Sequence, residues 1–256
     1  MFRNYKNKKN DRVDGVREFY KKLYNNQTIG KVYSLKKKYG EEVNAIMSMN
    51  VAVELMNSFV DPSDPDLDMP NLVHAFQTAE RIRKKYPNDK QLQVCGLIHD
   101  VGKVLFAFGE SPEFIVGDTF VLGCEIPKSV VHYDTIDTSY HHHKFGMYPP
   151  FVGLENLELS YGHDEYLYQV LLKNKSNHKL EQKYMDIIRY HSFYPWHSKG
   201  EYKHLMNTCD EETLENVKIF NEFDLYSKGD NKKISYFARD YYFYLLKDFF
   251  PEPLMW

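Results

Sequence analysis

A histidine followed directly by an aspartate stands in the segment Ile98-His99-Asp100-Val101-Gly102-Lys103. The imidazole can hold one metal ion, while the two oxygens of the neighbouring carboxylate can reach a second ion. Imidazole and carboxylate together suit iron, manganese or zinc. Four histidines and two aspartates are enough ligands for two metals, so the pattern predicts a metal-dependent enzyme. The four further candidate ligands are His74, His163, His191 and Asp224.

Lys103 follows Asp100 by three residues, a spacing that places both side chains on one face of a helix. An ammonium beside the metals could hold a bound anion or a substrate oxygen, and we favour this role for Lys103. The alternative is a cation that the helix dipole stabilises near a C-terminus.

Two of the candidate ligands are predicted from apolar surroundings. His74 lies in Leu72-Val73-His74-Ala75-Phe76, where a lone histidine is more often a core residue. Its helix precedes the His99 helix by a short link, however, and consecutive elements usually pack as neighbours. Asp224 stands between Phe223 and Leu225, and a buried carboxylate is costly without a metal or cation.

The His-Asp pair recurs at His163-Asp164. We expect His163 to be the ligand, and Asp164 to accept a hydrogen bond from a neighbouring group or to lie on the surface. His197 follows His191 closely and is a reserve candidate only. His141-His142-His143 is interpreted as a solvated loop.

The apolar residues of the segments that carry these candidates recur mostly at helical spacing, which predicts that helices position them. We predict an all-α bundle in a single domain spanning residues 1–256, with residues 1–30 as a basic N-terminal arm or lid. Residues 106–160 are rich in Gly, Pro and aromatics, and are expected to form loops and short strands in one long irregular excursion. Helices are predicted over residues 43–60, 70–86, 92–105, 163–173, 179–192, 211–223 and 233–248.

Charge and cysteine content limit the class of protein. Residues 1–40 hold twelve Lys or Arg and three acids, a net charge of +9, so the rest must carry −12 to reach the total of −3. No nucleic-acid-binding motif accompanies the basic stretch, which we interpret as solvated helix faces. Three cysteines without a Cys-x-x-Cys pair fit reduced thiols. With no apolar leader and no membrane-length apolar run, we expect a soluble cytoplasmic protein that binds neither membrane nor nucleic acid.

Together these motifs resemble the myo-inositol oxygenase family, a distorted branch of the HD-domain superfamily. The resemblance runs in the family's order over nearly the whole chain. A His-Asp pair alone is weak, whereas this set is very specific. The matching segments are residues 2–5 (FRNY), 61–66 (DPSDPD), 74–80 (HAFQTAE), 96–103 (GLIHDVGK), 116–120 (VGDTF), 162–169 (GHDEYLYQ), 189–197 (RYHSFYPWH) and 220–228 (FNEFDLYSK).

The resemblance implies a mixed-valent Fe(II)/Fe(III) site and a four-electron, O2-dependent ring cleavage that converts myo-inositol to D-glucuronate. One iron would take His74, His99, Asp100 and Asp224, and the other His163, His191 and the second oxygen of Asp100. Catalytic roles fall to Asp100 and Lys103. We expect a monomer. The resemblance places polyol contacts at Arg3, Asp61, Pro62, Ser63, Lys103, Gly117, Asp118, His191 and Ser192, with Pro62 replacing a residue that is often acidic in the family.

Two other readings stay open from the residues alone. An HD-type phosphohydrolase would use His74, His99, Asp100 and Asp224 equally well, but would need neither His163 nor His191. Its phosphate would also meet the acidic loop at residues 61–68. A non-catalytic iron or polyol sensor would keep the same scaffold.

Overall fold

The computed structural model describes residues 11–58, 61–63, 71–137, 143–224 and 234–256. Helices dominate this part of the chain, and its one sheet pairs two short strands in antiparallel order. The predicted all-α, HD-like class is confirmed. The elements are α1 (Asp11–Asn26), α2 (Ile29–Glu41), β1 (Ile46–Met47), α3 (Met49–Leu55), α4 (Asn71–Lys85), α5 (Lys90–Ile98), the 3-10 helix η2 (Val101–Phe106), α6 (His163–Lys173), α7 (Gln182–Tyr190), α8 (Tyr194–His197), α9 (Asp210–Asp224), α10 (Tyr236–Phe249) and β2 (Leu254–Met255).

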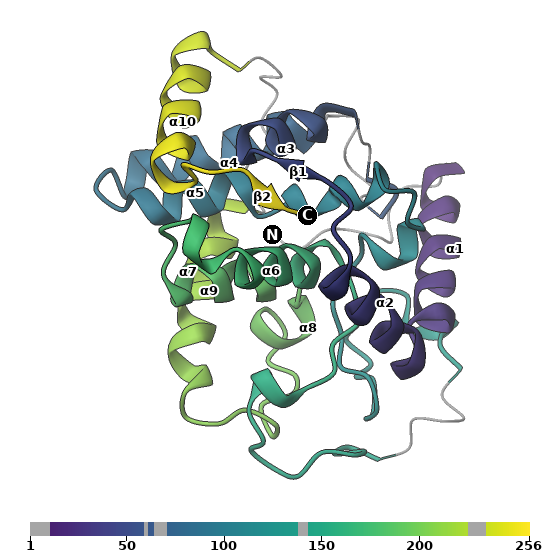
Figure 1. Cartoon of the computed structure of the whole chain (residues 1–256). Helices are drawn as coiled ribbons and strands as arrows, with labels where there is room; N and C mark the ends of the chain where they lie inside the picture. Colours follow the sequence, from purple (N-terminus) through teal and green to yellow (C-terminus); the bar gives the residue numbers. More distant parts are fainter. Residues whose placement is uncertain (1–10, 59–60, 64–70, 138–142, 225–233) are drawn as a thin grey trace.

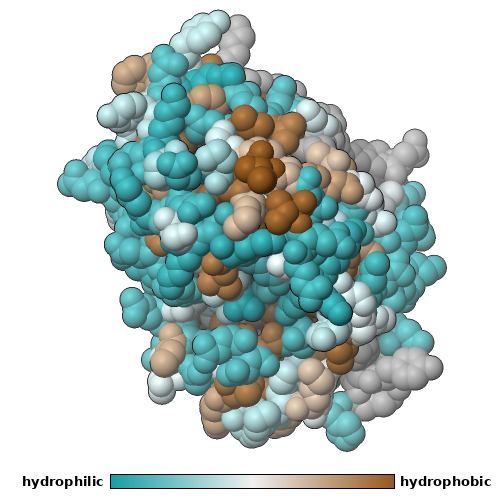
Figure 2. All heavy atoms as spheres, viewed as in Figure 1, coloured by the Kyte–Doolittle hydropathy of each residue, from teal (hydrophilic) through white to brown (hydrophobic). Residues whose placement is uncertain are grey.

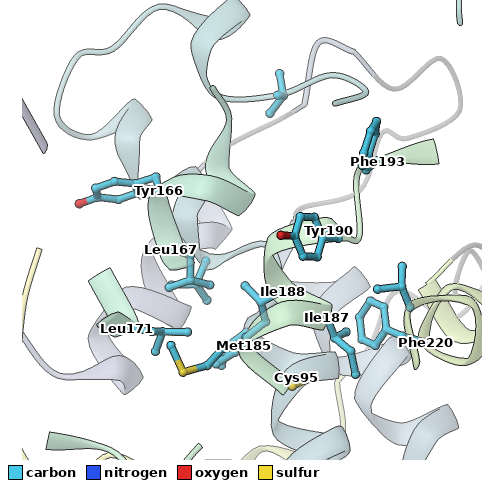
Figure 3. Close-up of a cluster of buried hydrophobic side chains, with 14 of the residues drawn as sticks. Cys95, Tyr166, Leu167, Leu171, Met185, Ile187, Ile188, Tyr190, Phe193 and Phe220 are labelled. Carbon is cyan, nitrogen blue, oxygen red and sulfur yellow. The ribbon is translucent and has the colours of Figure 1, made fainter. Parts of the chain in front are cut away.

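The core joins helices that are far apart in the sequence. Leucines of α6 pack with Met185 and Ile188 of α7, and α5 and α9 close the other side (Figure 3). Full burial of one such aliphatic side chain stabilises the fold by about 1.5–3 kcal/mol. In Figure 1, α1 and α2 lie on the side of the molecule opposite α10.

The predicted helix over residues 43–60 is wrong at its start. Ile46 and Met47 form β1 and pair with Met255 and Leu254, so their backbone groups bond across a sheet and not within a helix. Helix α3 begins only after Ser48, whose side chain accepts a hydrogen bond from the Val51 amide and caps the helix.

The predicted helix over residues 92–105 also divides. Helix α5 ends at Ile98, and the chain continues through His99 and Asp100 into η2. The two chemically important residues therefore occupy the break between two helices, where side chains can leave in different directions.

The other predicted elements agree more closely. Helix α6 has the predicted bounds, and α4, α7, α9 and α10 differ from theirs by one to three residues at each end. No helix bounds were predicted for α1 and α2, and the short α8 was not predicted. The central excursion is irregular as expected, with several 3-10 turns. The short strands expected there were wrong: the described residues of that region form a single bridge, between Val121 and Leu159.

The surface of the N-terminal helices is basic, as predicted. Lys21, Lys22 and Lys37 are exposed, while Val16 and Tyr20 of α1 are buried in the core. The role of residues 1–30 as an arm or lid stays a prediction, and residues 1–10 lie outside the described residues. Hydrophilic residues cover most of the face seen in Figure 2, around a small hydrophobic group. Within the described chain, no helix is long and apolar enough to cross a bilayer.

Candidate metal centre

All six predicted ligands lie at helix ends or breaks around one buried point, and each is at most 7% exposed. Helix α4 carries His74, and the break after α5 carries His99 and Asp100. His163 is the first residue of α6, His191 directly follows α7, and Asp224 is the last residue of α9. Five segments of the chain thus contribute to one site.

The first ligand group joins His74 and His99 to the two carboxylates. Oδ1 of Asp224 lies 2.9 Å from Nε2 of His74 and 3.4 Å from Nε2 of His99. Oδ2 of Asp100 lies 4.0 Å and 3.7 Å from the same two nitrogens.

The second ligand group lies on the other side of Asp100. Oδ1 of Asp100 is 3.1 Å from Nε2 of His163 and 3.8 Å from Nε2 of His191. Each oxygen of this carboxylate therefore faces a different pair of histidines. His74, His99 and Asp100 form one cluster of potential metal ligands, and Asp100, His163 and His191 form another.

The histidine tautomers agree with a metal at each cluster. Nδ1 of His99 lies 3.0 Å from the Gly96 carbonyl, and Nδ1 of His163 and of His191 lies 2.7 Å from the carbonyls of Ile115 and Ile188. A carbonyl oxygen only accepts, so each Nδ1 carries the proton and leaves Nε2 to bind a metal.

This arrangement is unfavourable without a cation. Nε2 of His163 lies 3.1 Å from Nε2 of His191, so two neutral rings would present lone pairs to each other. The same nitrogens face the Asp100 carboxylate. A metal ion between these atoms removes the repulsion, and the donor set of imidazole and carboxylate suits iron, manganese or zinc.

Both buried carboxylates are held in the ionised form. Burial raises the pKa of Asp100, but the Lys103 ammonium and His99 lower it more, and the net pKa lies well below its ordinary range. Burial likewise raises the pKa of Asp224, but the close approach of His74 and His99 lowers it more, and the net pKa lies well below its ordinary range. Ionised oxygens are the form that binds metals.

Lys103 is buried, and its ammonium contacts three oxygens. It donates to Oδ2 of Asp61 at 2.9 Å, to Oδ1 of Asn71 at 3.2 Å and to Oδ2 of Asp100 at 3.0 Å. Burial lowers the pKa of Lys103, but the two carboxylates raise it above the ordinary value, so the group stays charged. The contact with Asp100 that the spacing predicted is therefore present, and the role of Lys103 towards a substrate stays a prediction.

Seven of the nine residues predicted to contact a polyol lie around the same point. Asp61, Ser63, Gly117, Asp118 and Ser192 line a cavity of about 40 Å³ together with the candidate ligands. This exceeds the roughly 10–15 Å³ that one water needs by a similar measure. The lining is polar almost throughout, unlike the apolar lining that most ligand pockets have.

Two of the predicted contacts are not part of this lining. The Ser63 amide and hydroxyl both donate to Oδ1 of Asp61, which forms a tight turn and leaves Pro62 between them exposed. Arg3 lies outside the described residues. The contacts predicted for Pro62 and Arg3 therefore stay predictions.

Three residues of the site were missed from the sequence. Asn71 accepts from Lys103, Tyr194 donates its hydroxyl to Oδ2 of Asp224 over 3.2 Å, and Tyr20 donates to Oδ1 of Asp118 over 3.0 Å. Asn71 and Tyr194 lie three residues from His74 and His191, a spacing that could have indicated them. Nothing in the sequence links Tyr20 to Asp118, 98 residues away.

The reserve ligand has another role. Nε2 of His197 lies 2.9 Å from the backbone carbonyl of His191, and burial lowers the pKa of His197 to about 4. His197 is therefore neutral and braces the turn that carries His191.

Fold and site together define an all-α, HD-like protein with a buried histidine-carboxylate centre suited to metal ions. A sequence model of the myo-inositol oxygenase family matches residues 13–256. The chain belongs to the myo-inositol oxygenase family.

Named relatives cover the whole chain. It is 42% identical over 265 residues to a probable inositol oxygenase of Oryza sativa subsp. japonica, spanning 100% of this chain and 85% of that protein. It is 40% identical over 262 residues to an inositol oxygenase of Danio rerio, spanning 100% of this chain and 93% of that protein. An inositol oxygenase of Dictyostelium discoideum is 42% identical over 267 residues, spanning 100% of this chain and 89% of that protein.

Proposed function

We propose that this chain is an inositol oxygenase that uses O2 to open the ring of myo-inositol and yields D-glucuronate. One observation carries the proposal: in a chain of this family, the Asp100 carboxylate presents one oxygen to each of two histidine pairs. A phosphohydrolase of the HD type has no need of the second pair.

The proposed cofactor is two iron ions in the mixed-valent Fe(II)/Fe(III) state. His74, His99, Asp100 and Asp224 would hold one iron, and His163, His191 and Asp100 the other. Bound there, the irons would supply Lewis-acid and one-electron redox chemistry that no side chain offers. The three Nδ1–carbonyl contacts support this assignment, because they aim Nε2 of His99, His163 and His191 at the proposed metal positions.

The chain's own residues would bind and orient the polyol. Asp61 and Asp118 can accept hydrogen bonds from hydroxyl groups, and Ser63 and Ser192 can both donate and accept. Lys103 would place a positive charge near a substrate oxygen that becomes negative. A sugar that leaves these buried groups unpaired would bind poorly, which gives selectivity.

The charge of the cavity supports a neutral polyol over a phosphate ester. Among the described residues that line it, Lys103 is the one lysine or arginine, and Asp61, Asn71 and Asp100 already take up its donors. Carboxylates at Asp61 and Asp118 would repel a phosphate but would accept from hydroxyl groups.

The proposal is tested by measuring oxygen uptake and glucuronate formation by the iron-loaded protein with myo-inositol. We expect one O2 per glucuronate, and loss of both signals in His191→Ala and Asp100→Ala. His204→Ala is the matched control, because its ring contacts the Lys144 carbonyl outside the cavity. Phosphate release from nucleotides without oxygen uptake would favour the phosphohydrolase, and two bound irons with neither activity would favour a sensor.

The monomeric state and the cytoplasmic location stay predictions. Light scattering of the iron-loaded protein would test the first, and localisation of the tagged protein in cells the second.

A further inference from the structure

Thr119 joins three separate segments of the chain. Its hydroxyl donates to Oδ2 of Asp164 over 2.6 Å, and its backbone N–H donates to the carbonyl of Ser192 over 2.9 Å. Asp164 is 1% exposed and Thr119 is 4% exposed, so water does not compete for either group. A short hydrogen bond to a buried carboxylate is among the stronger ones in proteins.

Each partner of Thr119 adjoins a candidate ligand. Asp164 follows His163 at the start of α6, and Ser192 follows His191 after α7. Thr119 itself follows Gly117-Asp118, which lines the cavity. One residue thus connects the cavity loop to both histidines of the second ligand group.

The same loop contacts α1 on its other side. Gly117 has a φ of +105°, and a Cβ there would overlap the Leu23 side chain. Asp118 accepts a hydrogen bond from Tyr20. Helix α1 therefore packs against one side of the loop. On the other side, the contact with Asp164 fixes the loop relative to the candidate metal centre.

Asp164 is suited to this task by its place at the first turn of α6. Its Oδ1 accepts from the Glu165 amide over 2.8 Å while Oδ2 accepts from Thr119. A negative charge at a helix N-terminus is favoured by the helix dipole. Its burial also excludes the surface role that the sequence had left open for Asp164.

We propose that Asp164, acting through Thr119, is a positioning residue that fixes the Gly117-Asp118 loop over the metal centre. The proposal rests on the proposed function in one respect, because the loop is assigned there to polyol binding. Its consequence for the reaction is a lower affinity for the polyol when the contact is lost, with the chemical step largely kept.

The test uses Thr119→Val, which removes the hydroxyl and keeps the shape, and Thr119→Ser, which keeps the hydroxyl. Thr213→Val on α9 is the matched control for the same chemical change outside the loop. Amide hydrogen exchange of residues 115–120 in the iron-loaded protein reports the loop directly, and steady-state kinetics report KM and kcat.

In Thr119→Val we expect faster exchange over residues 115–120, a rise in KM on the order of tenfold and a kcat within about twofold of the parent, because one charge-assisted contact is lost. Thr119→Ser restores all three values, and Thr213→Val leaves them unchanged. In an Asp164→Ala background, Thr119→Val adds no further loss, because the contact is already absent.

Unchanged exchange over residues 115–120 in Thr119→Val would overturn the proposal, as would a Thr119→Ser variant that behaves like Thr119→Val. A Thr119→Val protein with faster exchange but an unchanged KM would overturn the link to the polyol. Absence of turnover in the parent would contradict the proposed function alone, since hydrogen exchange still decides whether Asp164 and Thr119 fix the loop.

Discussion

Gly102 lies directly against the backbone carbonyl of His163, so that a Cβ on Gly102 would overlap that oxygen. Gly102 lies in η2, which directly follows Asp100, and His163 is the first residue of α6. A close backbone approach therefore sets the distance between Asp100 and His163.

Gly102→Ala is expected to weaken the centre. The methyl group forces η2 and α6 apart, and such overpacking costs about 1–3 kcal/mol. We expect a lower free energy of unfolding in urea and loss of iron from the second ligand group, measured by metal analysis. Gly15→Ala is the control: nothing lies within 4 Å of that position on α1, so it should stabilise the protein by about 0.5–1 kcal/mol.

Lys103→Met should destabilise the protein and abolish turnover. The change leaves the carboxylates of Asp61 and Asp100 buried without their cation, and removing one partner of a buried pair costs about 3–5 kcal/mol. Urea unfolding measures the loss. Adding Asp61→Asn should recover part of the stability but not the activity, and a Lys103→Met protein as stable as the parent would contradict the ion-pair account.

Metal removal should lower the melting temperature. A ligand that binds only the folded state stabilises it in proportion to the logarithm of its concentration over its Kd. Calorimetry before and after a chelator, then after re-addition of iron, measures the change. The increment should vanish in Asp100→Asn and persist in Asp186→Asn, an acid of α7 outside the centre; an equal increment in both variants would exclude Asp100 as a shared ligand.

The free energy of unfolding should fall as the pH is lowered, in part because His178 is buried in its neutral form. Nε2 of His178 donates to the Leu171 carbonyl, and Nδ1 accepts from the Leu180 amide, so the neutral ring is the bound form. Burial lowers the pKa of His178 below its ordinary value of 6.5. The unfolded chain therefore takes up the proton first, and stability is full above pH 6.5 and declines as the pH falls towards the folded pKa.

The test for His178 is urea unfolding between pH 7.5 and pH 5.5. We expect the parent to lose more stability over this range than His178→Gln, which cannot titrate. Equal losses in the two proteins would show that His178 does not contribute to the pH dependence.

The sequence predicted α4, α6, α7, α9 and α10 closely, and the structure brings the six candidate ligands together as the pattern indicated, because both follow from local signals. No helix bounds were predicted for α1 and α2. Helix α6 shows periodicity and begins at the candidate ligand His163, and buried Asp224 stands out among apolar neighbours. The pairing of Ile46 with Met255 could not be foreseen, since it joins segments 209 residues apart without a local signal. The break at His99-Asp100 was also missed; just after it, Gly102 packs against the backbone of His163, a long-range contact that no local pattern shows.

Contacts of the site that depend on packing were missed for a related reason. Tyr20 reaches Asp118 only because α1 lies against the irregular central region, and no spacing in the chain encodes that. Asn71 and Tyr194, three residues from candidate ligands, were within reach of a helical-spacing argument. Residues with local signals were therefore found from the sequence, whereas contacts that depend on long-range packing were not.

The ligand set also bears on how the protein is made. His74 and Asp224 share a hydrogen bond across 150 residues of chain, so a growing polypeptide holds an incomplete set of groups until α9 has emerged from the ribosome. The second cluster is complete earlier, once His191 has been synthesised. Capture of the proposed iron by the first cluster would then come late in synthesis, more than a hundred residues after His74 and His99 have been added to the chain.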